Sequence, residues 1–220
     1  VSCALICIRD RFYKDARFEI KKLENTTRKN LSGIIWLSKL YNHAHAYSDT
    51  MRIMQLYKDF KTKPREKELS QAFWKSFYPP AYAKIIHNNA TILNIDPYFV
   101  KGLIRQESLF NSTVQSRAGA IGLMQIMPKT GRLEFGVTAD ELWDPRLNIQ
   151  LGIDFLAQLY RQYGNRWDLA LSHYNGGTLR GYGRNARPHG YTTVSYTHLR
   201  AHETREDLGW RVVDEKKKAG

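Results

Sequence analysis

The amino-acid sequence predicts an all-α protein, and three observations support this. Apolar side chains recur every three to four residues until about Arg180, alternating strand patterns are lacking, and no Gly-rich turns interrupt residues 31–60. Hydrophobic residues make up 42% of the 220 positions, which is enough for a sizeable core. A chain of this length suits one domain together with part of a second.

The first region is predicted to consist of short helices stacked as hairpins, as at the end of an α-solenoid. A charged run with a proline, residues 62–68, predicts a loop, and after one further helix the Pro79-Pro80 pair breaks the chain. We therefore expect a helical region over residues 1–77, with a boundary near Phe77 to Pro80. The apolar positions at helical spacing are Ile34, Leu37, Tyr41 and Ala44, then Ile53, Leu56, Tyr57 and Phe60.

Two helices are predicted after this boundary, one over residues 81–94 and one that begins at Pro97. Asp96 is the expected N-cap of the second helix, because Pro97 at the first helical position loses no hydrogen bond there. Since a helix turns by about 100° per residue, Glu107 is expected in the middle of the apolar stripe. The stripe consists of Val100, Leu103, Ile104 and Glu107, at positions i, i+3, i+4 and i+7.

The remaining elements are predicted from caps and helix breakers. Residues 119–128 are predicted to form a short helix that Pro128 ends, followed by a loop rich in Gly, Thr and Asp. Asn148 is the expected cap of a helix through Tyr163, and Asp168 that of a shorter helix ending at Gly176-Gly177. These elements complete a predicted domain over residues 78–179.

Charge is unevenly distributed along the chain. The formal net charge is +13, and residues 1–75 carry +8, residues 76–179 carry +1 and residues 180–220 carry +4. A basic region favours an anionic partner, but the first region contains no recognisable nucleic-acid motif, so we do not expect nucleic-acid binding. No run approaches about 18 apolar residues, so we expect neither a signal peptide nor a membrane span.

No metal or cofactor site is expected from the sequence. Cys3 and Cys7 stand one helical turn apart, which suits neither a disulfide framework nor a zinc site. The seven histidines form no HExxH motif and no Cys/His cluster. The glycines at 119–122 do not follow a predicted strand, as a dinucleotide-binding turn must.

Glu107 is the candidate catalytic residue. A buried carboxyl loses the hydration of its charged form, which raises its pKa and keeps it protonated near neutral pH, as a general acid requires. The alternative is a structural glutamate at the edge of the stripe, paired with Arg105 or another cation. Position alone does not decide between the two interpretations.

The surrounding motifs resemble the soluble lytic transglycosylase domain, a goose-lysozyme-like family that cleaves peptidoglycan. The resemblance covers roughly residues 78–178, in the family's order and spacing. It implies that Glu107 is the catalytic acid/base and that Ser116, Met124, Gln125, Tyr174 and Asn175 bind substrate, with the Tyr174 hydroxyl reaching the catalytic carboxylate. The motifs are Glu107-Ser108, Ser116, the run GAIGLMQIMP at residues 119–128, and Tyr174-Asn175.

The resemblance also implies a reaction that needs one carboxyl. Glu107 would protonate the glycosidic oxygen between MurNAc and GlcNAc, and its carboxylate would then deprotonate the muramic-acid 6-hydroxyl, which attacks C1 and forms a 1,6-anhydro product. A goose-type lysozyme that hydrolyses the same bond, and a non-catalytic glycan-binding or scaffold remnant, are the alternatives. We expect a monomer of the periplasm or cell envelope that acts on peptidoglycan glycan strands.

Two features depart from the family pattern. His173 precedes the Tyr174-Asn175 pair, where the family usually has a small residue. The resemblance ends near Arg180, and residues 180–220 are predicted to be an irregular tail, interpreted as foreign or out-of-frame sequence joined to a truncated gene. This tail would leave the cleft without a wall and weaken activity.

Overall fold

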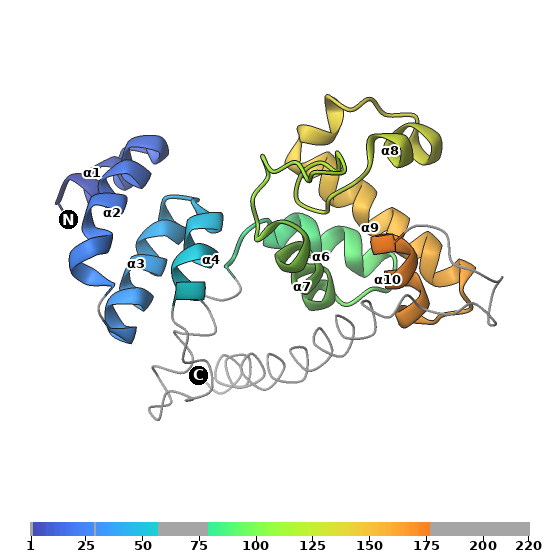
Figure 1. Cartoon of the computed structure of the whole chain (residues 1–220), viewed down its shortest axis with the longest axis horizontal. Coiled ribbons are helices and arrows are strands. Elements are labelled where there is room, and N and C mark those ends of the chain that lie inside the picture. The colour runs from blue at the N-terminus through green and yellow to red at the C-terminus, as the bar shows by residue number, and fades with distance from the viewer. Residues whose placement is uncertain (1, 29, 57–78, 177–220) are drawn as a thin grey trace. The chain divides into compact units, whose positions relative to one another are not determined.

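The computed structural model describes residues 2–28, 30–56 and 79–176, and its regular elements there are all helices (Figure 1). The predicted all-α fold is therefore confirmed. The chain divides into two compact units, Val1–Ala81 with Leu109–Asn111, and Tyr82–Ser108 with Ser112–Gly220. The domain limits expected from the sequence stay a prediction, because residues 57–78 lie outside the described part.

The first unit is a series of helices in which each packs on the next. It contains α1 (Ser2–Arg9), α2 (Tyr13–Thr27), α3 (Leu31–His43) and α4 (Tyr47–Leu56). Contacts join α1 to α2, α2 to α3 and α3 to α4, so hairpins follow one another along the chain. The core of this unit is formed by Ala4, Ala16, Ile20, Ile34, Ile35, Leu37, Leu40, Tyr41, Ala44, Ile53 and Met54.

A polar network crosses three of these helices. The buried carboxylate of Glu24 in α2 accepts hydrogen bonds from the Tyr41 hydroxyl in α3 and from the Arg52 guanidinium in α4. Arg52 also contacts Asp49, which accepts a further hydrogen bond from Arg17. The network satisfies two buried acids and fixes the three helices relative to one another.

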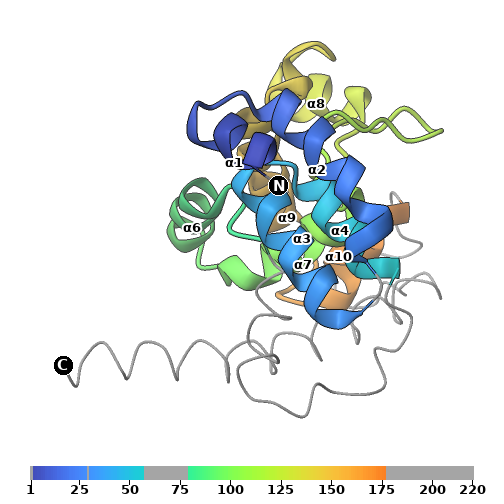
Figure 2. The same cartoon turned by 90° about the vertical axis from the view of Figure 1, so that its left-hand side faces the viewer.

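The second unit is organised around one long helix. It contains α6 (Ala83–Ile92), α7 (Pro97–Ser108), α8 (Pro128–Phe135), the 3₁₀ helix η1 (Glu141–Trp143), α9 (Pro145–Gln162) and α10 (Trp167–Gly176). Helix α9 contacts α6, α8, η1 and α10, and α6 also contacts α7. In both views α8 lies near the start of α9 and α10 near its end (Figures 1 and 2).

The predicted start of α7 is confirmed, but the predicted caps of the last two helices are wrong. The Asp96 carboxylate accepts from the Tyr98 N–H at 2.8 Å, as an N-cap does. Asn148 lies inside α9 instead, because Asp144 caps this helix by accepting from the Arg146 and Leu147 N–H groups. Helices α7 and α9 thus begin in the same way, with an Asp followed by a Pro.

The cap expected at Asp168 is one residue inside its helix. Helix α10 begins at Trp167, and the Asp168 carboxylate pairs with Arg166 just before it. An acid in the first turn still interacts favourably with the helix dipole, so the residue type fits the helix start although the position is shifted.

The short helix predicted for residues 119–128 does not form. Gly119, Gly122 and Gln125 have left-handed φ angles of 92°, 79° and 50°, which a right-handed helix cannot contain. The segment is a tight loop with isolated bridges from Ile121 to Gln115 and to Ile126.

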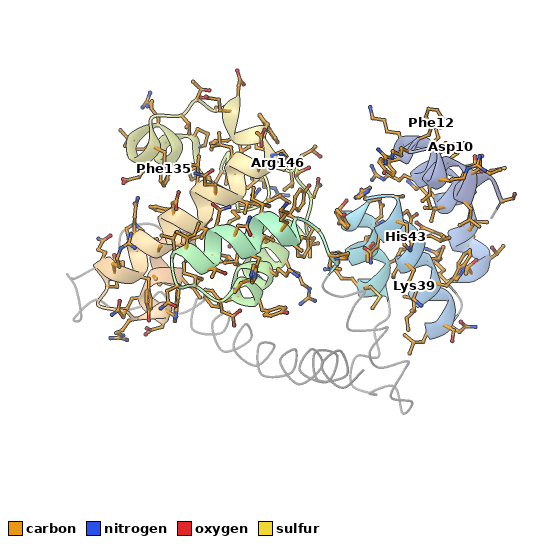
Figure 3. All side chains as sticks on the ribbon, turned by 180° about the vertical axis from the view of Figure 1, so that it is seen from behind. Asp10, Phe12, Lys39, His43, Phe135 and Arg146 are labelled. Carbon is orange, nitrogen blue, oxygen red and sulfur yellow. The ribbon has the colours of Figure 1, made fainter. Side chains whose placement is uncertain are left out.

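Helix α8 and η1 replace the loop expected after Pro128. This proline occupies the first position of α8, where it loses no hydrogen bond, so it opens a helix rather than ending one. Seen from behind, Phe135 marks the end of α8 and Arg146 the first turn of α9 (Figure 3).

Several expectations fall on residues that the structure leaves undescribed. The loop over residues 62–68 and the irregular tail over residues 180–220 are among them. Within the described residues, no helix combines the length and the apolar character that a membrane crossing needs.

Candidate active site

Glu107 occupies the last turn of α7, partly buried at the end of its apolar stripe. Val100, Leu103 and Ile104, the stripe residues before it, are at most 1% exposed. The next residue, Ser108, is buried, and its hydroxyl donates a hydrogen bond to the Ile104 carbonyl at 3.0 Å. The helix thus holds one carboxyl at the edge of a fully apolar surface.

The carboxyl of Glu107 is easily kept protonated at this position. Burial raises its pKa from 4.5 to about 7, and no charged group among the described residues is a cause of that rise. The carbonyl groups at the C-terminal end of α7 also disfavour a negative charge in the last turn. Glu107 therefore has the proton affinity that a general acid needs near neutral pH.

Tyr174, on α10, is the second side chain of the site. Burial, and then the charge of Glu107, raise the pKa of Tyr174 well above its ordinary value, so the two side chains lie within electrostatic reach. The Tyr174 hydroxyl donates to the Met124 carbonyl at 2.6 Å. Residues 50 positions apart in the chain thus meet at one place, with Glu107 beside them.

Asn148 organises the loop that carries Met124. Its side-chain oxygen accepts from the Met124 N–H at 2.8 Å, and its amide nitrogen donates to the Ile121 and Leu142 carbonyls, at 2.9 Å each. The sequence analysis missed this role and assigned Asn148 to a helix cap. The signal was available, because Asn148 is a polar residue on an apolar helix face, as Glu107 is.

Two glycines allow the loop to approach α9 closely. A Cβ atom at Gly152 would come within 2.4 Å of the Met124 sulfur, and one at Gly122 within 2.6 Å of the Asn148 amide nitrogen. The Met124 side chain is fully buried against α9. In this structure Met124 therefore contributes its backbone carbonyl to the site.

Ser116 and Gln125 make hydrogen bonds within the same loop. The Ser116 hydroxyl accepts from the Ala120 N–H at 3.0 Å, and the Gln125 amide donates to the Gly122 carbonyl at 2.8 Å. Both side chains are partly buried, whereas Asn175 is exposed in the last turn of α10. The structure thus brings Met124 and Tyr174 together near Glu107, and sugar contacts by Ser116, Gln125 and Asn175 stay predictions.

Within residues 2–28, 30–56 and 79–176, no three His, Cys, Asp or Glu side chains are grouped as metal ligands would be.

A helical fold with a partly buried glutamic acid in the last turn of α7 is typical of a lysozyme-like domain. Residues 84–190 match the model of the Transglycosylase SLT domain family. The family resemblance expected from the sequence is confirmed.

Named relatives share this region. The soluble lytic murein transglycosylase of Escherichia coli K12 is 34% identical over 110 residues, covering 47% of this chain and 17% of the relative. The transglycosylase of Enterobacteria phage PRD1 is 41% identical over 85 residues, covering 39% and 31%. The membrane-bound lytic murein transglycosylase C of Haemophilus influenzae PittGG is 37% identical over 90 residues, covering 37% and 25%. The matches span less than a third of each relative.

Two solved structures show the same fold. The 70-kDa soluble lytic transglycosylase in complex with bulgecin A has a TM-score of 0.60 at 23% sequence identity. The match covers 80% of this chain and 27% of the transglycosylase chain. An inactive mutant of the lytic transglycosylase Slt from Pseudomonas aeruginosa has a TM-score of 0.56 at 24% identity, with the same coverage.

Proposed function

We propose that this chain is a peptidoglycan lytic transglycosylase, a carbon–oxygen lyase that cleaves the β-1,4 bond between MurNAc and GlcNAc and forms a 1,6-anhydromuramyl end. Glu107 is its sole general acid/base. The observation that carries the proposal is a single glutamic acid with a pKa raised by burial to about 7, placed beside Tyr174. The names of the relatives, which are murein transglycosylases, support the substrate.

One group with a pKa near 7 can perform both proton transfers. The protonated carboxyl gives its proton to the glycosidic oxygen as the bond to C1 breaks, so the leaving sugar departs as an alcohol. The carboxylate that results takes the proton of the muramic-acid 6-hydroxyl, whose oxygen then bonds to C1. The enzyme returns to its protonated form, and water takes no part.

A second carboxylate is not needed for this route. Hydrolytic glycosidases use a pair of acids, one of them to form a glycosyl-enzyme or to activate water. Here the nucleophile belongs to the substrate, and an intramolecular hydroxyl has a high effective concentration. Burial causes the pKa rise of Glu107, and no neighbouring charge in the described part of the chain contributes to it. This cause fits a site with one acid.

Ser116, Gln125 and Asn175 contact the sugars around the bond, and Met124, whose side chain is fully buried, acts through its backbone carbonyl. Ser116 and Gln125 belong to the loop over residues 112–127, Met124 holds the Tyr174 hydroxyl, and Asn175 follows Tyr174 on α10. We propose that they orient the glycan strand over Glu107.

The setting we propose is a monomer in the periplasm or cell envelope, where peptidoglycan lies. The +8 charge of residues 1–75 would hold the chain to the anionic sacculus. The relatives named above, which act on murein by name, support this location.

Digestion of purified sacculi tests the proposal. The wild-type chain is incubated with sacculi beside Glu107→Gln and the matched control Glu134→Gln, which alters an exposed acid on α8. Mass spectrometry of the released fragments separates anhydro products from hydrolysed ones, which contain one more water. Anhydro products from wild type and control, and none from Glu107→Gln, are expected. Hydrolysed products would favour a lysozyme-like hydrolase, and no release by the wild type would refute enzymatic activity.

A further inference from the structure

Asn148 uses its side-chain oxygen and both of its amide protons to bind three backbone groups around the site. The side chain is fully buried, its oxygen accepts from Met124, and its two amide protons go to Ile121 and Leu142. The Met124 and Ile121 bonds join α9 to the loop over residues 112–127, and the Leu142 bond joins α9 to η1. A buried amide that is fully satisfied in this way holds its partners in one geometry.

Met124 is held from both sides of its Cα atom. Its N–H donates to Asn148, and its carbonyl oxygen accepts the Tyr174 hydroxyl at 2.6 Å. The peptide group that contains this carbonyl is also held by the Gln125 N–H, which donates to the Gly122 carbonyl at 3.3 Å. Asn148 thus anchors the N-terminal side of Met124, while Tyr174 and the Gln125 N–H hold the peptide group on its C-terminal side.

The direction of the Tyr174 hydrogen bond restricts what this tyrosine can do for Glu107. A phenol has one proton, and here the Met124 carbonyl accepts it. Toward any other group the Tyr174 oxygen can only accept a hydrogen bond. An acceptor beside a carboxyl favours the protonated acid, whereas a donor would favour the carboxylate.

We propose that Asn148 is a positioning residue for Glu107: it aims the Met124 carbonyl at Tyr174, which keeps the tyrosine's proton away from Glu107 and so preserves the acid in its protonated form. The inference rests on the proposed function for the meaning of Glu107 as the acid. The charge of Glu107 is one of the causes that raise the pKa of Tyr174.

A titration of Glu107 by NMR tests this without any turnover. The full chain is labelled with ¹³C at the glutamate carboxyls, and Glu107 is assigned by the signal that Glu107→Gln lacks. In Asn148→Ala the Met124 N–H loses its acceptor, so the loop segment that contains the Met124 carbonyl is expected to shift and to leave Tyr174 free to donate to Glu107. The pKa of Glu107 is then expected to fall from about 7 to roughly 6 or lower.

The double variant separates positioning from general loosening of the fold. In a Tyr174→Phe background no hydroxyl exists to be released, so Asn148→Ala is expected to leave the pKa of Glu107 where Tyr174→Phe alone puts it. A loss of packing would instead change the pKa equally with and without the hydroxyl. An unchanged pKa in Asn148→Ala, or an equal fall in both backgrounds, overturns the proposal.

Two further variants complete the experiment. Asn89→Ala is the matched control, because the Asn89 amide also donates to a backbone carbonyl, that of Ile85, but does so on α6. It is expected to leave the titration of Glu107 unchanged. If Asn148→Ala does not fold, Gly122→Ala displaces the Asn148 amide by a methyl group and is read out in the same two backgrounds. Absence of activity on sacculi would refute the proposed function and leave this titration interpretable.

Discussion

Replacing Glu107 by Gln is expected to remove a loss of stability that the wild type suffers as the pH rises toward neutrality. The pKa of Glu107 is about 7 in the folded chain, against 4.5 as its ordinary value. Between these two pH values the carboxyl is protonated in the folded chain and ionised in the unfolded chain. The free energy of unfolding of the wild type therefore falls as the pH rises through this range. Glutamine has the same shape and no titration, so the variant avoids this loss.

The sign and size follow from the two pKa values. Below about pH 4.5 the carboxyl is protonated in both states, and its contribution to stability is fully present. As the pH rises from 4.5 to 7 the contribution is lost, at about 1.4 kcal/mol for each tenfold difference in proton affinity. The whole window amounts to a loss of about 3 kcal/mol in the free energy of unfolding at pH 8 relative to pH 4.

Urea unfolding from pH 4 to pH 8 measures this difference. The free energy of unfolding of Glu107→Gln minus that of wild type is expected to rise by about 3 kcal/mol across the range, because every other group titrates equally in both proteins. Glu134→Gln, at an exposed acid, is expected to run parallel to wild type. Parallel curves for Glu107→Gln and wild type would refute the reasoning and, with it, the raised pKa.

Three further substitutions have expected effects that urea unfolding can measure. Tyr174→Phe removes the hydrogen bond to the Met124 carbonyl and is expected to lower the free energy of unfolding by about 1–2 kcal/mol. Gly152→Ala forces a methyl group against the Met124 side chain and is expected to cost about 1–3 kcal/mol. In the first unit burial opposes ionisation of Glu24, but hydrogen bonds, first that of Arg52, lower its pKa, so Glu24→Ala is expected to cost about 1–3 kcal/mol at pH 7 and progressively less as the pH falls.

Matched variants provide controls for the Gly152→Ala and Glu24→Ala substitutions. Gln158→Ala alters an exposed position of α9 and is expected to change stability by less than about 0.5 kcal/mol, in contrast to Gly152→Ala. Glu19→Ala removes a surface ion pair with Lys22 on α2 and is expected to change stability by less than about 0.5 kcal/mol. An equal cost for Gln158→Ala and Gly152→Ala, or for Glu19→Ala and Glu24→Ala, would contradict the structural reasons given.

Sequence patterns predicted the elements whose signals are local. The Asp96-Pro97 start of α7 and the place of Glu107 on its stripe followed from cap chemistry and helical spacing alone. The same rules misplaced the start of α9, because Asn148 has the residue type of a cap while its amide is bound to backbone groups 6 to 27 residues away. A residue type reports what a side chain can bind, and the partner is decided by the fold.

The loop over residues 119–128 shows the same limit. Its apolar residues predicted a helix, yet Ile121 pairs with Ile126 and Gln125 adopts a left-handed conformation. Hydrophobic content cannot distinguish a short helix from a tight loop that packs on a neighbour, and here contact with α9 through Gly152 decides the outcome.

By itself the sequence determined the helical class, the family resemblance and the acid placed in line with Val100, Leu103 and Ile104, because helical period and motif spacing are properties of consecutive residues. Only the tertiary structure decided which groups surround that acid. Tyr174 donates its proton to Met124, and Asn148 holds Met124 in place, through contacts that span 50 and 24 positions of the chain. Burial, which sets the proton affinity of Glu107, likewise arises only when distant helices pack against it.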